Sequence, residues 1–401
     1  MDNFQKEHEL FFNTYKRLPL EIESGEGCYL FSKDGNKYLD LFGGLAVNSL
    51  GYSHPKIIEA IEKQIRKYNH LSNTFLQTPQ VELAELLLQQ TKYKKVFFTN
   101  SGTEAIESAM KLVRKWGKKK NKVNVFGMSN GFSGRTYGAL SIMDKEKYKS
   151  GYEPFLPNTS VIRFNDVDDL ISKVNETTGG IFLEFIQGEG GIVPASKEFI
   201  EQLFLLREKF DFLIIADEIQ AGIGRTGKFF CFEHYNVQPD VICFAKAVGG
   251  GLPLGGILGN EKVADVFTVG VHGTTFGGNP VACCAGIATV KEILENGIMQ
   301  NAIEVGNYFL EKLCMSKNKF PNFIKEVRGK GMMLGVELTH DGSTVAEKML
   351  ENGVLINCTN VNVLRLLPPL ILSKEQVDDA MKVFEKVFSE FSENNFPVTA
   401  K

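Results

Sequence analysis

The sequence predicts an α/β protein whose large domain has a mostly parallel sheet covered by helices, with a smaller α+β domain built from the chain ends. Three observations support this prediction. Short apolar runs recur through the middle of the 401-residue chain, segments with helical spacing separate them, and the two ends follow a different pattern. Strands that alternate with helices pair in parallel, and the helices then cover both faces of the sheet.

The middle region begins with "KVFF" (residues 95–98), a short apolar run that predicts a strand. The segment "EAIESAMKLVRKW" follows it, and its apolar residues recur at the spacing of one helix face. Two more buried strands are predicted in "GIFLEFI" and "FDFLIIAD", with a helix in "KEFIEQLFLLREKF" between them. A further strand is predicted in "DVICFA".

The two ends of the chain predict a separate, smaller domain. Asp34 and Gly35 supply the turn of a hairpin in "GCYLFSKDGNKYLDLF". Near the other end, "FIKEVRGKGMMLGVEL" and "GVLINCTNVNVLRLLPPLIL" predict strands with helices between them. We therefore expect a large α/β domain over residues 51–300 and a small domain formed by residues 1–50 and 301–401.

Composition argues against nucleic acid and membranes as partners. The formal net charge is −3, so no global field attracts nucleic acid or an anionic membrane. The densest basic run, "RKWGKKKNK", is expected to be the solvated end of a helix rather than a nucleic-acid site. No apolar run reaches about 18 residues without a charge or a Gly or Pro break, so no membrane span is predicted.

The cysteines, the histidines and the first residues indicate a cytoplasmic protein without a metal site. The seven cysteines are odd in number and form no CxxC pair, which favours reduced thiols over disulfides. The six histidines show no metal-binding spacing. The opening "MDNFQKEHEL" is charged and lacks the apolar core of a signal peptide.

A single lysine interrupts the apolar segment "VICFAKAVGGGLPLGGILGN" (residues 241–260). Desolvation disfavours the charged form of an amine, so we expect a lowered pKa for Lys246. A neutral amine is a nucleophile that condenses with carbonyl groups. Lys246 is therefore the first candidate catalytic residue.

The segment "TNSGTEA" (residues 99–105) joins the first predicted strand to its helix. Ser101 and Glu104 have the spacing of a capping box. Two interpretations stay open at this point. The segment is a well-capped helix start, or it is an anion site in which Ser101, Gly102 and Thr103 surround a phosphate at the helix N-terminus.

The segment "GIGRTGK" (residues 222–228) matches both the dinucleotide-binding and the P-loop patterns, but its context argues against each. Phe229 follows the lysine, whereas a P-loop needs Ser or Thr there to hold magnesium. Both motifs also open a helix directly after a strand. Here "DEIQA" intervenes, and "KFFCFEHYNVQPD" is a poor helix.

Asp217 ends a predicted buried strand in "LIIADEIQ", at the carboxyl end where α/β sheets place their sites. A cap or a structural ion pair is the alternative for any single Asp. Lys246 lies 29 residues later (246 − 217), after the next strand, so the two side chains are expected side by side. A desolvated amine, a carboxylate and a phosphate cradle are the groups that pyridoxal 5′-phosphate requires.

Several motifs occur in order between about residue 20 and residue 370: "YLDLFGGLAVNSLGYSHP", "SNTFLQTPQVELAELL", "TNSGTEAIESAMKLVRK", "GFSGRT", "IQGEGG", "FAKAVGGGLPLGG", "HGTTFGGNP" and "VLRLLPPLIL". On these motifs the chain resembles the class-III (ω-amino) aminotransferases, and most closely those that act on acetylornithine. The resemblance implies the type I fold of pyridoxal-phosphate enzymes and a homodimer with shared active sites. It also implies transfer of the terminal amino group of N-acetylornithine to 2-oxoglutarate, a step of arginine biosynthesis.

The resemblance further implies roles for individual residues. Lys246 would form the Schiff base with the cofactor, and Asp217 would pair with its pyridine nitrogen. The other implied cofactor contacts are Gln220 on the phenolic oxygen, Phe132 and Ile219 on the two ring faces, and Ser101, Gly102, Thr103 and the other subunit's Thr275 on the phosphate. The implied substrate-binding residues are Arg135, Glu189 and Arg365.

Two positions depart from the family's usual pattern, and several functions stay open. Phe185 stands where proline is usual, and Ser133 stands where histidine is frequent, which leaves the shape of the pocket open. The amino donor could instead be ornithine, 4-aminobutyrate or succinyl-diaminopimelate, because one or two pocket contacts change such a preference. A nucleotide-binding ATPase or dehydrogenase, and a non-catalytic binding protein on the same fold, are more distant alternatives.

Overall fold

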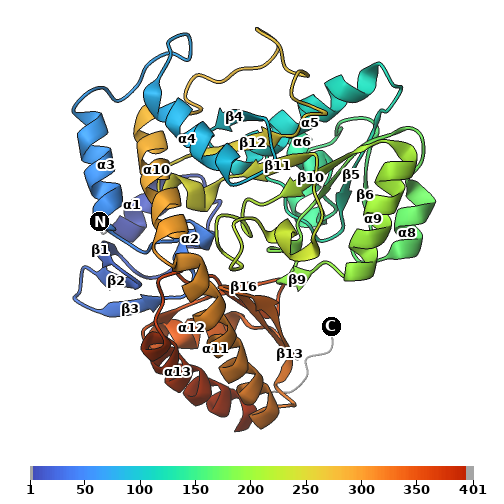
Figure 1. The fold of residues 1–401 in the computed structure, drawn as a ribbon. Coiled ribbons are helices and arrows are strands. Elements are labelled where there is room, and N and C mark those ends of the chain that lie inside the picture. Colours follow the sequence, from blue (N-terminus) through green and yellow to red (C-terminus); the bar gives the residue numbers. More distant parts are fainter. Residues whose placement is uncertain (1–2, 394–401) are drawn as a thin grey trace.

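The centre of the protein is a seven-stranded sheet, seen in the upper part of Figure 1 in a computed structural model that describes residues 3–393. The strand order is β4-β12-β11-β10-β7-β5-β6. The strands are β4 Lys95–Thr99, β5 Asn124–Met128, β6 Thr159–Ile162, β7 Thr178–Leu183, β10 Leu213–Asp217, β11 Val241–Phe244 and β12 Gly255–Gly259. Only β12 pairs antiparallel with its neighbours within this sheet, so the predicted mostly parallel sheet is confirmed.

Both faces of this sheet are buried, as expected for parallel strands. On one face, Ile215 and Cys243 belong to an apolar cluster with residues of α5 (Gly102–Lys118). Ile214 and Phe244, one residue along each strand, belong to the other cluster, which includes residues of α9 (Lys197–Phe210). Successive side chains point to opposite faces of a strand, so helices are required on both sides.

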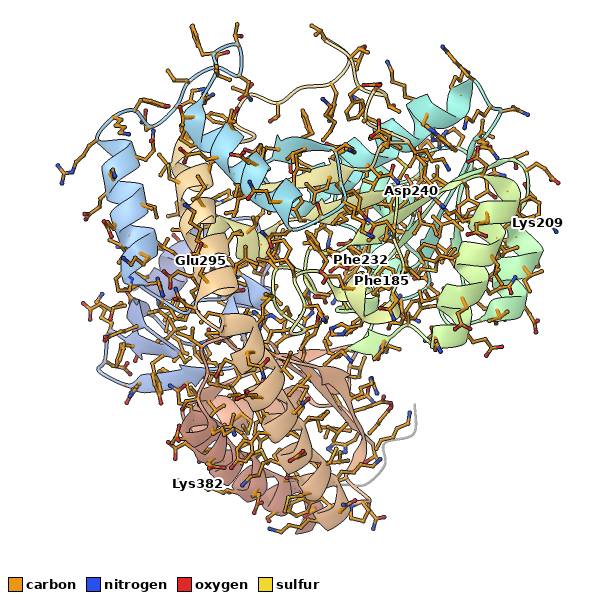
Figure 2. The ribbon with its side chains drawn as sticks, viewed as in Figure 1. Phe185, Lys209, Phe232, Asp240, Glu295 and Lys382 are labelled. Carbon is orange, nitrogen blue, oxygen red and sulfur yellow. The ribbon has the colours of Figure 1, made fainter. Side chains whose placement is uncertain are left out.

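The predicted strand "GIFLEFI" is interrupted in the structure. β7 ends at Leu183, and the short β8 (Ile186–Gln187) pairs with β9 (Val193–Pro194) in a separate two-stranded sheet. Between them, Phe185 is fully buried, and its ring lies 6.2 Å from that of Phe232 (Figure 2). The apolar run therefore reflects burial on both sides of a bend, which periodicity alone cannot distinguish from one strand.

Strand β12 was not predicted, because its sequence "GGILG" carries glycines where strands usually carry β-branched residues. The structure gives a reason for one of them. A Cβ on Gly256 would lie 2.7 Å from the ring of Phe244 on the neighbouring strand. Only glycine leaves room for that ring on this face of the sheet.

The two ends of the chain share a second sheet. β1 (Ile22–Glu26), β2 (Tyr29–Ser32) and β3 (Lys37–Asp40) form antiparallel pairs, and β15 (Val354–Leu355) adds parallel to β3. The predicted hairpin turn is present between β2 and β3, where Gly35 has a φ of 86° that suits glycine.

A third sheet, with the order β13-β14-β17-β16, belongs to the C-terminal part of the chain. Its strands are β13 Ile324–Lys330, β14 Met333–Leu338, β17 Val363–Leu366 and β16 Asn357–Thr359, and the helices beside it are α11 Ile298–Lys319, α12 Ser343–Glu351 and α13 Lys374–Glu393. The division of the chain at residues 50 and 300 remains a prediction. Residues 1–2 and 394–401, which the predicted small domain includes, lie outside the described part of the chain.

The remaining helices are short or lie on the surface of these layers. They are α1 Asn3–Leu10, α2 Gly43–Ala46, α3 Pro55–Ile65, α4 Thr78–Gln89, α6 Tyr137–Ser141, α7 Glu146–Lys149, α8 Val167–Lys173 and α10 Pro280–Glu295, with the 3₁₀ helices η1 Cys231–Tyr235 and η2 Lys246–Gly249. No helix within residues 3–393 is both long enough and apolar enough to cross a membrane.

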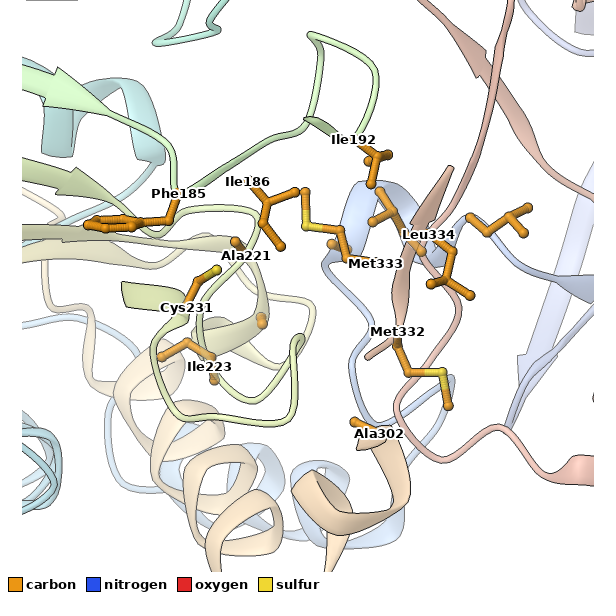
Figure 3. Packing of buried hydrophobic residues seen from close by; sticks show 14 of the residues in the cluster. Phe185, Ile186, Ile192, Ala221, Ile223, Cys231, Ala302, Met332, Met333 and Leu334 are labelled. Atoms are coloured by element: carbon orange, nitrogen blue, oxygen red, sulfur yellow. The ribbon is translucent and has the colours of Figure 1, made fainter. Parts of the chain in front are cut away.

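The nucleotide-like segment at residues 222–228 forms turns and leads only into η1, so neither nucleotide motif has the helix it needs. Ile223 of this segment belongs to the same cluster of buried apolar residues as Cys231, Met332 and Met333 (Figure 3). The buried Arg225 donates hydrogen bonds to the carbonyl oxygens of Met332 and Pro368. The segment therefore joins the central sheet region to the C-terminal strands.

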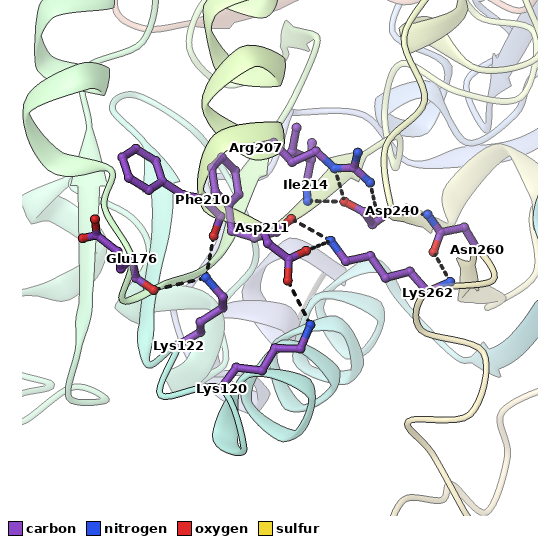
Figure 4. Close-up of polar contacts among 11 residues, drawn as sticks. Lys120, Lys122, Glu176, Arg207, Phe210, Asp211, Ile214, Asp240, Asn260 and Lys262 are labelled. Atoms are coloured by element: carbon purple, nitrogen blue, oxygen red, sulfur yellow. Dashed lines mark hydrogen bonds and ion pairs between the residues drawn. The ribbon is translucent and has the colours of Figure 1, made fainter.

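In the basic run at residues 114–122, Lys115, Lys118, Lys119 and Lys120 are exposed as predicted, whereas Lys122 is buried (Figure 4). Lys120 pairs with Asp211 at 2.9 Å, as a solvent-facing helix end can. Lys122, however, is only 9% exposed and donates to the carbonyl oxygens of Phe210 and Glu176. The prediction of a solvated run is wrong for Lys122, whose amine satisfies buried backbone acceptors.

Asp240 fixes the amino end of β11 (Figure 4). Its carboxylate is fully buried and accepts hydrogen bonds from the Arg207 guanidinium, the Ile214 backbone N–H at 2.9 Å and the Asn260 amide at 3.0 Å. These donors come from α9, from β10 and from the residue after β12. One carboxylate therefore aligns the beginnings of neighbouring strands.

We expect Asp240→Ala to lower the free energy of unfolding by about 3–5 kcal/mol, because it leaves the Arg207 charge and two other donors without their acceptor. Urea denaturation measures the loss as a lower midpoint. The control is Asp379→Ala, which removes an exposed pair with Lys382 and should leave the midpoint unchanged. Equal midpoints for the two variants would contradict this role of Asp240.

Candidate active site

A cavity of about 480 Å³ lies beyond the carboxyl ends of β7, β10 and β11. Its size suits a small-molecule ligand. The predicted site residues that line it are Ser101, Gly102, Thr103, Phe132, Arg135, Glu189, Asp217, Ile219, Gln220 and Lys246. Two other predicted residues, Arg365 and Thr275, are not part of its wall.

Lys246 is the first residue of η2 and is separated from the end of β11 by Ala245 alone. Parallel pairing sets Asp217 of β10 level with Cys243 of β11, so Lys246 extends past the same sheet edge at which Asp217 lies. Its backbone has a φ of 53°, a strained value for a residue with a side chain. Desolvation, and then the positive charge of Arg365, lower the pKa of Lys246, as its apolar flanks predict.

Asp217 presents a buried carboxyl group with little compensation. Its Oδ1 accepts one hydrogen bond, from the Ile219 backbone N–H at 3.0 Å. Desolvation raises the pKa of Asp217 to about 7, and the Ile219 N–H and the Lys246 charge only partly oppose this rise. A cation placed against this carboxyl group would favour its ionised form.

The turn from β4 into α5 forms one wall of the cavity. Ser101 caps the helix by accepting from the Glu104 backbone N–H at 3.3 Å. The Glu104 carboxylate accepts from the Asn100 backbone N–H at 2.8 Å instead of from Ser101, so the capping box is closed one residue early. The N–H groups of Gly102 and Thr103 lie in the first helical turn, which has no intrahelical acceptors for them, and both residues line the cavity.

Gly102 is also required by close packing. A Cβ at this position would lie 2.9 Å from both Cδ1 and Cγ2 of Ile219, across the cavity floor. Gln220, next to Ile219, has a buried amide oxygen without a hydrogen-bond partner among the described residues. A buried unpaired amide is costly, so Gln220 has hydrogen-bonding capacity for a ligand in the cavity.

The predicted substrate residues are held in different ways. The Arg135 guanidinium is exposed at the cavity rim and stacks on the Tyr148 ring, 3.7 Å from its centroid. Arg365 is 2% exposed and lies behind Glu189, with 2.5 Å between its Nη1 and the Glu189 Oε1. Glu189 therefore stands between the cavity and Arg365.

Thr275 is exposed and lies outside the cavity of its own chain. The neighbouring Thr274 faces inward, where its hydroxyl accepts from the Gly277 backbone N–H at 3.2 Å. The structure therefore does not bring Thr275 together with the other predicted phosphate residues of the same chain.

Sequence reasoning missed Glu184, which also lines the cavity. Its two carboxyl oxygens accept from the Phe132 N–H at 3.1 Å and the Gly188 N–H at 2.9 Å. Desolvation, and then the charge of Asp217, raise the pKa of Glu184 to about 8. Glu184 follows β7 as Asp217 ends β10, so the strand-end rule that selected Asp217 could have selected it too.

The two departures from the family pattern fall in different places. Phe185 packs in the core against Phe232 and Tyr235 and does not line the cavity. Ser133 does line the cavity, and its backbone N–H faces the sulfur of Met143 at 3.3 Å. Only Ser133 can therefore change what a ligand meets.

A family model described as "Aminotransferase class-III" matches residues 11–388. The chain belongs to the class-III aminotransferases. The family resemblance and the enzyme class expected from the sequence are thus confirmed, and so is the α/β fold.

Relatives of this class-III chain cover nearly its whole length. It is 46% identical to the acetylornithine aminotransferase of Aquifex aeolicus, over 94% of this chain and 98% of the relative. It is 43% identical to the acetylornithine aminotransferase of Methanocaldococcus jannaschii, over 96% of this chain and 97% of the relative.

Solved structures of the family superpose closely on it. The ornithine aminotransferase of Toxoplasma gondii gives a TM-score of 0.94 at 30% identity, covering 98% of this chain and 95% of that one. The acetylornithine aminotransferase of Elizabethkingia anophelis gives a TM-score of 0.87 at 32% identity, covering 97% of this chain and 98% of that one.

Glu184→Gln should loosen the two cavity loops that the carboxylate ties together. An amide offers one acceptor oxygen, so either the Phe132 or the Gly188 N–H loses its partner. One lost hydrogen bond of about 1 kcal/mol corresponds to roughly fivefold faster backbone hydrogen exchange in that loop. Mass spectrometry of exchanged peptides measures it, with the exposed Glu146→Gln as the control. Unchanged exchange in both loops would show that Glu184 does not hold them.

Proposed function

We propose that this aminotransferase transfers the terminal amino group of N-acetylornithine to 2-oxoglutarate, giving N-acetylglutamate semialdehyde and glutamate, as a step of arginine biosynthesis. The observation that carries the proposal is one cavity that joins Lys246 and Asp217 to Arg135 and to the Glu189–Arg365 pair. The acetylornithine aminotransferases among its relatives, at 46% and 43% identity, support this donor. Free thiols at all seven cysteines are compatible with action in the cytoplasm.

The residues of the cavity fit pyridoxal 5′-phosphate (PLP). The first turn of α5 offers N–H groups to a phosphate, and the Lys246 charge only partly offsets the desolvation of Asp217, so a cation against Asp217 would favour its ionised form. The unpaired amide of Gln220 offers a hydrogen bond, and Phe132 and Ile219 line the cavity as apolar faces for a ring. A second structure of the Toxoplasma gondii ornithine aminotransferase, which is 29% identical to this chain, has partial occupancy of PLP at its active site.

When bound, the cofactor would supply an aldehyde that condenses with amines and a ring that accepts the electrons released at the substrate carbon. Lys246 has a desolvated Nζ at this place, and in its neutral form Nζ would take the proton from the substrate carbon. Asp217 would hold the pyridine nitrogen of the cofactor in its protonated form, because a carboxylate favours a neighbouring positive charge. Glu184 holds the loops of Phe132 and Gly188 around the reacting groups.

The two substrates need different carboxylate sites. Arg135 at the rim would bind the α-carboxylate of acetylornithine and, later, the side-chain carboxylate of 2-oxoglutarate. Arg365 would bind the α-carboxylate of 2-oxoglutarate or glutamate. Glu189 neutralises Arg365 as long as the ω-amine donor is present, and the 2.5 Å ion pair supports this role.

Ornithine is the second candidate donor, because an ornithine aminotransferase superposes with a TM-score of 0.94. A donor screen with 2-oxoglutarate distinguishes the two. We expect kcat/KM for acetylornithine to exceed that for ornithine and for 4-aminobutyrate by tenfold or more, which corresponds to about 1.4 kcal/mol. A larger kcat/KM for ornithine or 4-aminobutyrate would overturn the proposed donor.

We also propose a homodimer in which Thr275 reaches the phosphate of the other subunit. Exposed apolar side chains on and beside the Thr275 loop support a covered surface, since Phe75 is 62%, Leu76 89% and Phe276 59% exposed. The segment that contains Phe75 and Leu76 contacts the Thr275 loop through Asn73, whose amide donates to the carbonyl oxygens of Thr274 and Gly277.

Replacing Glu189 by Ala should affect the two amino donors unequally. Arg365 would lose its charged partner and could capture acetylornithine in an unproductive pose. We expect the single-turnover rate with acetylornithine to fall about tenfold or more, for about 1.4 kcal/mol, and the rate with glutamate to stay or rise. Equal losses with the two donors would refute the gating role of Glu189.

Mixing two inactive or weak variants tests the shared site. Lys246→Ala should be inactive, and Thr275→Ala should be weak when cofactor is scarce. In a mixed dimer, one site carries both changes and the other has neither, so activity at limiting cofactor should recover. If activity does not recover although subunit exchange is confirmed, Thr275 does not act across the interface.

A further inference from the structure

Arg365 has a second acceptor that the proposed gate does not use. Its Nε and Nη2 donate to the Oδ1 of Asn357, at 3.1 and 2.6 Å, and its Nη1 donates to Glu189. A guanidinium has donors only, so the atom of Asn357 that faces it must be the oxygen. The neutral amide of Asn357 therefore binds Nε and Nη2 of the guanidinium, and the carboxylate of Glu189 binds Nη1.

The two acceptors differ in how firmly the fold holds them. Asn357 lies on β16, directly opposite Arg365 of β17 in an antiparallel pair. Glu189 lies in the turn between β8 and β9, where the Lys145 amine donates to its backbone carbonyl at 2.7 Å and the Thr359 hydroxyl makes only a long hydrogen bond, 3.4 Å, to its Oε2. A change of the Glu189 rotamer can break its bond to Arg365, whereas Asn357 stays level with Arg365 for as long as the strand pair persists.

They differ also in charge. Burial alone would raise the pKa of Glu189, but the charge and hydrogen bond of Arg365 lower it, so Glu189 is an anion at neutral pH. The amide of Asn357 carries no charge. When Glu189 withdraws, Arg365 would keep two of its hydrogen bonds, and its positive charge would no longer be compensated by a carboxylate.

We propose that Asn357 is a positioning residue that holds the Arg365 guanidinium for a substrate α-carboxylate without neutralising it. The inference rests on the proposed role of Arg365 in binding 2-oxoglutarate and glutamate. A carboxylate at the position of Asn357 would accept the same hydrogen bonds and compete permanently with the substrate. The neutral amide at this position is therefore what allows one arginine to be neutralised with one donor and charged with the other.

The test is Asn357→Asp, which changes the charge and keeps the shape of the side chain. We expect the KM for glutamate and for 2-oxoglutarate to rise tenfold or more, which is about 1.4 kcal/mol. The single-turnover rate with acetylornithine should stay within about twofold, because Arg365 is meant to be neutralised with that donor. Calorimetry with glutarate, a dicarboxylate that does not react, should show a Kd raised in parallel with the KM for glutamate.

Asn360→Asp is the matched control. It adds the same charge in the turn between β16 and β17, where Asn360 is exposed, and it should leave the KM values and the glutarate Kd unchanged. If Asn357→Asp does not fold, Asn357→Ser withdraws the oxygen and keeps the site neutral. The glutarate Kd and the KM for glutamate should then rise, with acetylornithine unaffected.

The inference is overturned if Asn357→Asp folds and leaves the glutarate Kd unchanged, or if it slows both donors equally. An unchanged glutarate Kd in Asn357→Ser would also overturn the inference. A wrong assignment of acetylornithine as the amino donor would give a different result. In that case the unmodified enzyme would not react with acetylornithine, while glutamate, 2-oxoglutarate and glutarate would still report on Asn357.

Discussion

Desolvation of one amine is the constraint on which the arrangement of this protein depends. Lys246 must sit at the carboxyl edge of a buried sheet, among apolar residues that lower its pKa, and still lie beside Asp217. Parallel strands provide that edge, because the residues that follow β7, β10 and β11 meet there. At the opposite edge, Asp240 ties the beginnings of β10 and β11 to α9 and so fixes the register that places Asp217 and Lys246.

Charges in the cavity are balanced closely. Glu184, Asp217 and Glu189 line it with acidic groups, Lys246 and Arg135 line it with basic ones, and Arg365 adds a third basic group behind Glu189. Burial raises the pKa of Asp217 to about 7 and that of Glu184 to about 8. Arg365 lowers the pKa of Glu189, and it lowers that of Lys246 as well. A ligand that brings a cation, a phosphate and a carboxylate would complete this balance. Pyridoxal 5′-phosphate would bring the first two and a substrate the third.

Much of the fold was predictable because it follows from local patterns. The helix at residues 197–210 was predicted with its observed bounds, and the hairpin with its turn at Gly35 was predicted from a two-residue signal. The prediction failed where tertiary packing decides. Strand β12 carries several glycines, one of which, Gly256, makes room for the Phe244 ring, and the apolar run at residues 180–186 bends where Glu184 binds two loops. Lys122 is buried by carbonyl groups that are distant in sequence.

Ten of the predicted site residues line one cavity, and two kinds of evidence led to their prediction. Lys246, Asp217 and the segment at Ser101 stood out by physical criteria, whereas Phe132, Gln220 and Arg135 came from the family resemblance alone. Glu184 was missed because "GIFLEFI" was predicted as one strand, which placed Glu184 inside the strand instead of at its end. Asn357 was missed because its role depends on a strand pairing that no local pattern reveals.

The central claim is that the Lys246 amine is the group that condenses with the cofactor. The most direct measurement is borohydride reduction of the purified protein with pyridoxal 5′-phosphate, followed by mass spectrometry of its peptides. We predict that the cofactor mass is fixed to the peptide containing Lys246, and that the visible absorbance is lost on reduction. Attachment to a different lysine, or no attachment at all, would contradict the claim.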